Sequence, residues 1–405
     1  MFENAAAIGA AFLFRARPRA AGACPGSPVL RFRHSFTLMT LSSLGWDDFF
    51  AGAFQPFASE NFLPARVALE HKHACVLLSA RGEITATCTG RLLHETATRA
   101  ALPAVGDWVA VRLRPESLAS GAGVALVGDI HAVLPRRTAF TRRAVGDADA
   151  EQVLATNVDT VFLVTGLDRD FNLRRIERYL AVARASEAQP VVVLNKSDLH
   201  PDARGAEAEV RRITRTAPVV TLSAARGDGI AALAPWLVPG ATVALLGSSG
   251  AGKSTLINRL LGKQRQDTGP LSHAMNKGRH TTTHRELLAL PGGALVIDTP
   301  GLRELQLWGV DESAVAETFP EVAALAAECR FPDCTHQREP GCAVRAALDD
   351  GTLDPTRWAS YEKLQREQAY AARRVDPVLA RAERDRWKKI YQGQRARERI
   401  EGRWE

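Results

Sequence analysis

The sequence predicts a multi-domain chain in which a small β-barrel is followed by a central parallel α/β domain and by a C-terminal helical domain built around clustered cysteines. Three observations predict this order. Short β-type runs punctuated by Gly and Pro occupy residues 63–135, strands alternate with helices beyond Gln152, and three of the 6 cysteines lie between Cys329 and Cys342. A length of 405 residues is enough for roughly two to four domains.

Residues 60–143 are expected to form a small closed barrel of the OB or SH3 type, because closure removes exposed strand edges. Cys75 and Cys88 lie in this segment and are expected to be small core residues. Small barrels serve many functions, so this one alone identifies no activity. Strands are expected at Ala74–Leu78, Ile84–Cys88, Trp108–Leu113 and Val124–Val127.

From residue 144 to residue 312 the pattern is that of a parallel α/β sheet. Continuous apolar strands that alternate with helices indicate a sheet covered on both faces. Ligands of such sheets bind at the carboxyl ends of the strands. Strands are expected at Thr160–Thr165, Val191–Leu194, Val219–Leu222, Val243–Gly247 and Ala294–Asp298, and a helix at Leu173–Ala185.

The distribution of charge suits a polyanionic partner. The formal net charge is +7, residues 1–38 carry five Arg and one Glu, and residues 373–405 carry eleven Lys or Arg and six Asp or Glu. The segment between them is slightly acidic. Basic flanks around an acidic centre are typical of proteins that bind nucleic acid, and a surface charged for solubility is the alternative.

The first 38 residues fit no part of this domain pattern. Their apolar run at 5–14 is too short to cross a bilayer, which takes about 20 residues, and its arginines follow the run, unlike those of a secretory signal. We expect the protein to begin at Met39, and the alternative is a transit peptide. Residues 1–59 are therefore expected to be a disordered extension or the product of a mis-assigned start. The sparse cysteines predict a reducing, cytoplasmic compartment. The short apolar runs predict that the protein has no membrane partner.

A phosphate-binding loop directly follows the strand expected at Ala241–Leu246. Residues 247–254, Gly-Ser-Ser-Gly-Ala-Gly-Lys-Ser, match the P-loop pattern, and a helix is expected at Ser254–Leu261. Backbone N–H groups would wrap phosphate oxygens, while Lys253 reaches the β- and γ-phosphates and the Ser254 hydroxyl ligates Mg²⁺. The nucleotide-binding residues expected here are Gly247, Ser248, Ser249, Gly250, Ala251, Gly252, Lys253, Ser254 and Thr255.

A second motif, Asn-Lys-Ser-Asp at 195–198, indicates that the nucleotide is GTP. The Asp198 carboxylate can accept hydrogen bonds from N1–H and the exocyclic amine of guanine, a pair of donors that adenine lacks, so ATP would leave it unpaired. The Ser-Ala dipeptide at 223–224 fits a backbone contact to guanine O6. The residues expected to bind guanine are Asn195, Lys196, Ser197, Asp198, Ser223 and Ala224.

A third motif, Asp-Thr-Pro-Gly at 298–301, ends another expected strand. Asp298 is placed to hold Mg²⁺ through a water, and the Gly301 N–H to reach a γ-phosphate. Ras-like proteins carry the P-loop before the guanine motif, whereas here both guanine motifs precede it. The sheet is therefore expected to be circularly permuted, which closely spaced domain termini permit.

Residues 278–283, Gly-Arg-His-Thr-Thr-Thr, lie where a switch threonine must contact Mg²⁺ and the γ-phosphate. The residues leave open which of the three threonines does so, and Thr282 is our candidate. Leu302 stands where Ras has the glutamine that orients the attacking water, so intrinsic hydrolysis is expected to be slow. His280 is a candidate for positioning that water, and a bystander histidine in the loop is the alternative.

Three thiols and one imidazole lie within a short span that follows the α/β domain. Cys329, Cys334, His336 and Cys342 make a complete tetrahedral zinc set with no open position for a catalytic water, so a zinc ion here is expected to be structural. Reduced cysteines without a metal are the alternative. We assign 313–375 to this domain and 376–405 to a basic tail. For the tail, an RNA-binding helix and a solvated charged helix are the two alternatives.

Together these motifs resemble the RsgA (YjeQ) family over about residues 60–375. The resemblance rests on the motif order, on the cysteine-histidine spacing, and on the segments Val105–Val109 and Gln152–Asp159. It implies an OB-fold barrel, a circularly permuted P-loop GTPase and a helical zinc domain. Members act in late maturation of the small (30S) ribosomal subunit, whose binding stimulates their GTP hydrolysis. The resemblance assigns guanine to 195–198, phosphate to 247–255 and zinc to the four Cys and His ligands.

The leading hypothesis is therefore a monomeric GTPase that docks on small-subunit rRNA and is released by hydrolysis, cycling between GTP and GDP. An RNA-binding assembly scaffold in which nucleotide is only a structural ligand is the second hypothesis. A zinc hydrolase is the third, and the closed four-ligand set argues against it.

Overall fold

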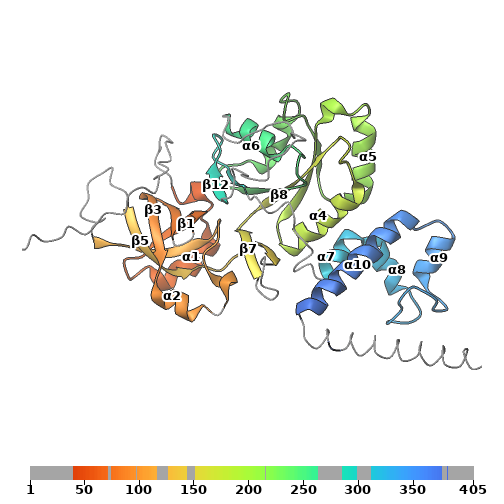
Figure 1. Ribbon diagram of the computed structural model, residues 1–405, viewed down its shortest axis with the longest axis horizontal. Coiled ribbons are helices and arrows are strands. Elements are labelled where there is room, and N and C mark those ends of the chain that lie inside the picture. Colours follow the sequence, from red (N-terminus) through yellow and green to blue (C-terminus); the bar gives the residue numbers. More distant parts are fainter. Residues whose placement is uncertain are drawn as a thin grey trace, which may run out of the picture. The chain divides into compact units, whose positions relative to one another are not determined.

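The computed structural model describes most of the chain beyond residue 39 (Figure 1). No helix in those segments is both long and apolar enough to cross a membrane. The expected basic-tail helix lies outside them except for Arg381. The described residues are 40–71, 74–96, 98–115, 126–143, 151–214, 216–262, 285–298, 312–375 and 381.

The N-terminal domain is a five-stranded barrel, as predicted. Strand β1 pairs with both β2 and β4, β3 runs parallel to β5, and β5 pairs with β4, so the strand order closes on itself. Side chains alternate between the inside and the outside, as in β2, and the inner ones form one apolar core. The strands are β1 (Leu63–Glu70), β2 (Cys75–Ser79), β3 (Gly82–Cys88), β4 (Trp108–Leu113) and β5 (Leu126–Val133).

Residues 40–57 form one helix and two 3-10 turns that pack on the barrel, which differs from the expected disorder through residue 59. Asp47 accepts hydrogen bonds from the backbone N–H groups of Phe49 and Phe50 and so caps α1 (Asp48–Phe54). The Trp46 ring lies edge-on to that of Trp108, at 4.7 Å between centroids. The aromatic side chains of this segment bury enough apolar surface to offset the cost of ordering it. Flanking 3-10 turns are η1 (Ser42–Leu44) and η2 (Gln55–Phe57).

The central sheet has the order β10-β9-β8-β11-β13-β12, in which only β12 runs antiparallel to its sheet neighbour β13. Helices α4 and α5 pack on one face and α6 on the other, so the sheet is covered on both sides (Figure 1). The strands are β8 (Thr160–Gly166), β9 (Gln189–Asn195), β10 (Val219–Thr221), β11 (Thr242–Leu246), β12 (Glu286–Ala289) and β13 (Leu295–Asp298), and the helices are α4 (Leu173–Ala185), α5 (Ala203–Thr214) and α6 (Lys253–Leu261).

Two features link the barrel to this sheet, a short β-ribbon and a direct pairing between strands. A two-stranded ribbon of β6 (Ala139–Arg143) and β7 (Glu151–Thr156), which the sequence patterns did not predict, leads into β8. Strand β1 of the barrel also pairs with β12 of the central sheet through the register position Leu69–Glu286. The barrel and the nucleotide-binding sheet are therefore joined by backbone pairing as well as by the chain itself.

Arg66 is buried at this junction, with 1% of its surface exposed. Its guanidinium donates to the carbonyl oxygens of Leu44, Gly106 and Asn157, at 2.5, 3.1 and 2.9 Å. Burial lowers the pKa of Arg66 to about 10, although the charges of Asp159 and Asp107 raise it. One side chain thus ties the N-terminal helices, the barrel and the start of the α/β domain together.

The C-terminal region is helical, as predicted. A buried arginine, Arg357 of α10, pairs with Glu177 of α4 and with Glu321 of α8, each at 2.5 Å. Its guanidinium also stacks over the Phe319 ring at 4.2 Å. These contacts attach the C-terminal helices to the α/β domain. The helices are α7 (Glu312–Thr318), α8 (Pro320–Ala327), α9 (Ala343–Asp349) and α10 (Pro355–Val375).

Candidate nucleotide-binding site and metal centre

The P-loop connects the end of β11 to the start of α6, and it needs glycine at three positions. Gly250 and Gly252 adopt φ angles of 82° and 92°, a region that other residues rarely enter. A Cβ on Gly247 would lie 2.1 Å from the carbonyl oxygen of Val164 in β8. The loop therefore lies tightly against the neighbouring strand, with its N–H groups at the helix N-terminus.

Lys253, the P-loop lysine, is 9% exposed and folds back over its own loop. Its ammonium donates to the carbonyl oxygens of Gly247 and Ser248, each at 2.6 Å. The positive charge is therefore held at the mouth of the loop, where phosphate oxygens would meet it.

Asn195 ties the guanine motifs to the P-loop. Its side-chain amide donates to the carbonyl oxygen of Ala251 at 2.9 Å, and its amide oxygen accepts from the Ala224 N–H at 2.9 Å. The side chain is buried, and a Cβ on Gly252 would lie 2.2 Å from its nitrogen. The structure thus brings together three motifs that the sequence separates by up to 56 residues.

The rest of the 195–198 motif stands at the carboxyl end of β9. Lys196 adopts a φ angle of 64°, and its ammonium pairs with the Asp168 carboxylate at 2.5 Å. The Ser197 N–H donates to the carbonyl oxygen of Leu222 at 3.2 Å. Asp198 follows with an exposed side chain, so its carboxylate is accessible to a ligand.

Two carboxylates that the sequence motifs missed lie in the segment after β8, Asp170 beside the P-loop and Asp168 beside the 195–198 motif. The Asp170 carboxylate accepts a hydrogen bond from the Ser248 hydroxyl and pairs with Arg175 at 2.6 Å. Partial burial raises the pKa of Asp168, but its contacts, chiefly with Lys196, outweigh that effect and leave the pKa below its usual value. Both residues follow a parallel strand at its carboxyl end, a position that the ligand rule for such sheets would have flagged.

Other expected residues lie nearby. Ser223 is buried, and its N–H donates to the carbonyl oxygen of Asp228 at 2.9 Å, while Arg259 of α6 donates to the carbonyl oxygen of Ala224 at 3.2 Å. Ser249 lies in the P-loop, and Ser254 and Thr255 lie in the first turn of α6. Asp298 ends β13, opposite Glu286 of β12. His280, Thr282 and Gly301 lie outside the described residues.

The four predicted metal ligands converge. The ligand atoms of Cys329, Cys334, His336 and Cys342 all lie within 4.8 Å of one another. His336 adopts a φ angle of 60°, and its ring lies 5.7 Å from that of Trp358, in an edge-on arrangement. Cys342 is buried at the start of α9, where its sulfur accepts from the Arg345 N–H at 3.4 Å.

The distances among three of the ligands, Cys329, His336 and Cys342, fit the edges of a tetrahedral zinc site. Zn–S bonds of about 2.3 Å and Zn–N bonds of about 2.0–2.1 Å require edges of about 3.8 Å between two sulfurs and about 3.6 Å between sulfur and nitrogen. The observed separation is 3.9 Å between the sulfurs of Cys329 and Cys342, and 3.5 Å from each of them to His336 Nδ1. The Cys₃His set leaves no open position, so a metal here would hold the loop together.

We expect Cys334→Ala to abolish metal binding and to loosen the loop between α8 and α9, because structural zinc contributes folding energy directly. Zinc content by elemental analysis and protease resistance of residues 328–342 check this. Cys88→Ala, in the barrel, is the control and should retain the metal. Equal zinc content in Cys334→Ala and the unsubstituted protein would contradict the assignment.

The fold and these motifs define the chain as a circularly permuted P-loop GTPase with an N-terminal barrel and a C-terminal cysteine-histidine cluster. A family model described as RsgA GTPase matches residues 133–308. The chain is 48% identical over 367 residues to "Small ribosomal subunit biogenesis GTPase RsgA" of Syntrophotalea carbinolica, covering 89% of this chain and 98% of that protein. It is 41% identical over 346 residues to the protein of the same name in Methanosarcina acetivorans, covering 85% and 90%.

Solved structures agree with these relatives. The crystal structure of YjeQ from Thermotoga maritima superposes with a TM-score of 0.55 at 27% identity, covering 75% of this chain and 97% of that one. The structure of YloQ, described as a circularly permuted GTPase, has a TM-score of 0.53 at 21% identity over 77% and 96%, and so supports the fold. The chain belongs to the RsgA family of GTPases.

Proposed function

We propose that this GTPase binds the small ribosomal subunit, assists its late maturation, and is released when the subunit stimulates GTP hydrolysis. The observation that carries the proposal is the name shared by relatives that match across nearly their whole length, "Small ribosomal subunit biogenesis GTPase". The basic net charge of +7 is consistent with a partner made of RNA. The protein would work as a monomer in the cytoplasm.

The nucleotide in this proposal is GTP. Asp198 would accept from N1–H and the exocyclic amine of guanine, Lys196 would lie over the base, and the Ala224 N–H would face O6. Asn195 supports all three by fixing the loops that carry them. The phosphates would lie along residues 247–255, with the Lys253 ammonium moving from its own loop carbonyls to the β- and γ-phosphates.

Mg²⁺ bound with GTP would neutralise charge on the β- and γ-phosphates. Ser254 offers its hydroxyl from the first turn of α6, and Asp298 offers a carboxylate from the end of β13. His280, Thr282 and Gly301 remain proposed participants in hydrolysis and switching. The cysteine-histidine cluster would hold a structural zinc.

Each domain would have a separate role in this function. We place the rRNA-binding barrel at 60–143, the GTPase domain at 144–312, the zinc domain at 313–375 and a basic tail at 376–405. Release on hydrolysis requires that the subunit bind the GTP and GDP forms with different affinities. The buried Arg357 contacts give the zinc domain a firm attachment to α4, so the two would move as a unit.

Nucleotide-dependent binding to small subunits tests the proposal. We expect the protein to bind them about tenfold or more tightly with a non-hydrolysable GTP analogue than with GDP, the usual scale of such coupling. Lys253→Ala should lose this difference. In the scaffold alternative, binding ignores the nucleotide, and Lys253→Ala supports subunit maturation in cells as well as the unsubstituted protein does.

A further inference from the structure

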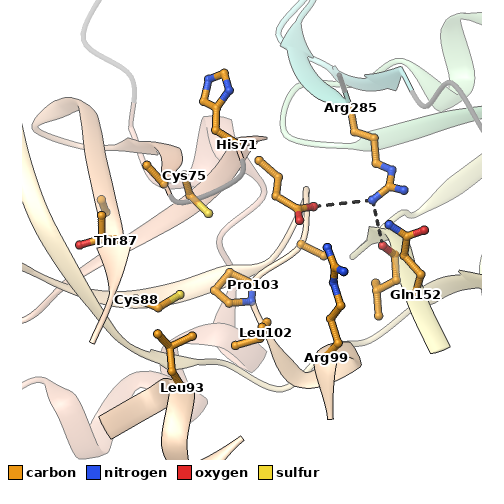
Figure 2. Close-up of a pocket in the computed structure, with 15 residues that line it drawn as sticks. His71, Cys75, Thr87, Cys88, Leu93, Arg99, Leu102, Pro103, Gln152 and Arg285 are labelled. Atoms are coloured by element: carbon orange, nitrogen blue, oxygen red, sulfur yellow. Dashed lines mark hydrogen bonds and ion pairs between the residues drawn. The ribbon is translucent and has the colours of Figure 1, made fainter. Parts of the chain in front are cut away.

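A pocket lies where the barrel meets the central sheet, away from the P-loop (Figure 2). Its volume is about 360 Å³, within the range of about 300–1,000 Å³ that is usual for sites that bind small molecules. Barrel strands β1 to β3 form one side, and the turn η3 (Arg99–Ala101), the start of β7 and Arg285 form the other. None of the nucleotide or metal motifs contributes to it.

Cationic groups dominate one wall of this pocket. The Arg285 guanidinium lies 3.6 Å from the Glu70 carboxylate and donates to the carbonyl oxygen of Val153 at 3.3 Å. The Arg99 guanidinium extends into the same space (Figure 2), and none of the ion pairs between described residues includes it. Burial lowers the pKa of Arg285, Glu70 raises it, and the charges of Arg142 and Arg99 lower it further.

Among the described residues that line the pocket, positive charge therefore exceeds negative charge. Glu70 is the one carboxylate among these described residues, and it lies beside the guanidinium groups of Arg285 and Arg99 (Figure 2). Apolar side chains also line the pocket, namely Leu93, which is 53% exposed, together with Leu102 and Pro103 (Figure 2). Paired guanidinium groups beside a small apolar surface suit a phosphate attached to a sugar or base.

We infer that this pocket binds a backbone phosphate of RNA, held by Arg99 and Arg285 with the attached nucleoside against Leu93. The inference rests on the proposed function for the source of the RNA. Phosphate contacts are what position a protein on nucleic acid, and each one adds to the salt dependence of binding.

Strand β12 connects this pocket to the nucleotide site. Arg285 directly precedes Glu286, which pairs with Leu69 of the barrel on one side and with Asp298 on the other. Asp298 is the carboxylate proposed to support Mg²⁺. A phosphate that holds Arg285 against the barrel would therefore favour one position of β12 beside the Asp298 carboxylate. Bound RNA could in this way change the rate of GTP hydrolysis.

Four variants of the full-length protein test the inference. Arg99→Gln and Arg285→Gln each remove a proposed phosphate ligand, and Glu70→Gln removes the competing carboxylate. Arg91→Gln is the matched control, because Arg91 is an exposed arginine on the adjacent α2 (Gly90–Glu95) that pairs with Glu95 and does not line the pocket. Thermal melting of each variant checks that it folds.

The first measurement is the affinity for a short fluorescein-labelled uridine oligonucleotide across a salt series. We expect Arg99→Gln and Arg285→Gln each to weaken binding about tenfold, because a hydrogen bond to a charged group is lost, and to reduce the salt slope by about one. Glu70→Gln should strengthen binding. If the Glu70–Arg285 pair is only structural, Glu70→Gln should not strengthen oligonucleotide binding, and that result would contradict the inference.

The second measurement is the stimulation of GTP hydrolysis by small subunits. Arg99→Gln should reduce the stimulation, whereas Arg91→Gln should not. If the oligonucleotide binds all variants equally, or does not bind the unsubstituted protein, the pocket assignment is wrong. If small subunits neither bind nor stimulate the unsubstituted protein, the proposed function fails, and the oligonucleotide series still decides the pocket.

Discussion

Asp198→Asn should convert the protein from a GTP-binding protein to one that prefers xanthosine triphosphate. The carboxylate accepts from N1–H and the exocyclic amine of guanine, whereas an asparagine amide would place a donor against that amine. Xanthine carries a carbonyl oxygen in place of the amine, so the amide would donate to it while its oxygen still accepts from N1–H. We expect the affinity for GTP to fall by roughly 10³-fold or more, because both hydrogen bonds are specific to guanine.

Competition binding with fluorescent GTP and xanthosine triphosphate measures this exchange. Asp202→Asn is a suitable control, because its exposed carboxylate accepts only from the Gly205 N–H, at 2.8 Å, and asparagine caps a helix equally well. Unchanged affinity for GTP in Asp198→Asn, with no gain for xanthosine triphosphate, would remove Asp198 from the base site.

Arg66→Met should be the most destabilising single change at the junction between the barrel and the central sheet. Methionine fills much of the same space but donates nothing, so the carbonyl oxygens of Leu44 and Asn157 would lose the Arg66 donor, and that of Gly106 would keep only the Asn157 amide. Each unsatisfied buried group costs about 1–3 kcal/mol, so the expected loss is roughly 3 kcal/mol or more.

Urea unfolding followed by tryptophan fluorescence measures this loss, since Trp108 lies beside Arg66 and Trp46 contacts Trp108. Arg112→Met on β4 is the matched control. Arg112 is 45% exposed, stacks on Phe62 and meets Glu60 at 3.5 Å, so its loss should cost at most about 1 kcal/mol. Equal midpoints for the two variants would show that the buried guanidinium does not hold the junction.

The sequence predicted the parts of the site that depend on local chain geometry. The P-loop and the 195–198 motif are short patterns whose glycines and polar residues follow buried strands, so their place at the carboxyl ends of β11 and β9 is predictable. The Cys₃His set was predicted in the same way, from spacing alone, and its ligand atoms meet as expected.

Contacts between distant segments could not be predicted from those patterns. Ser248 meets Asp170 across 78 positions, and Lys196 meets Asp168 across 28, because β8 happens to be the neighbour of both β11 and β9 in the sheet. The pairing of Leu69 with Glu286, next to the pocket between the barrel and the central sheet, depends on the arrangement of whole domains. Such contacts follow from the fold and carry no local sequence signal.

The N-terminal segment shows a different limit of prediction from the sequence. Because the first 38 residues fit no domain pattern, disorder or a mis-assigned start was expected through residue 59, yet the aromatic residues between 46 and 57 pack on Trp108 and form a cluster with it. The spacing of Trp46, Phe50 and Phe54, four residues apart, was a helical signal that could have revealed this. His280, Thr282 and Gly301 stay predictions.

The most direct test of the account is the rate of GTP hydrolysis by the purified protein, alone and with small or large ribosomal subunits. ATP serves as the nucleotide control, and Lys253→Ala as the inactive protein. The account predicts slow hydrolysis alone, a strong increase with small subunits, no increase with large subunits and no hydrolysis of ATP. Equal rates with and without small subunits would contradict a subunit-gated GTPase and favour the scaffold.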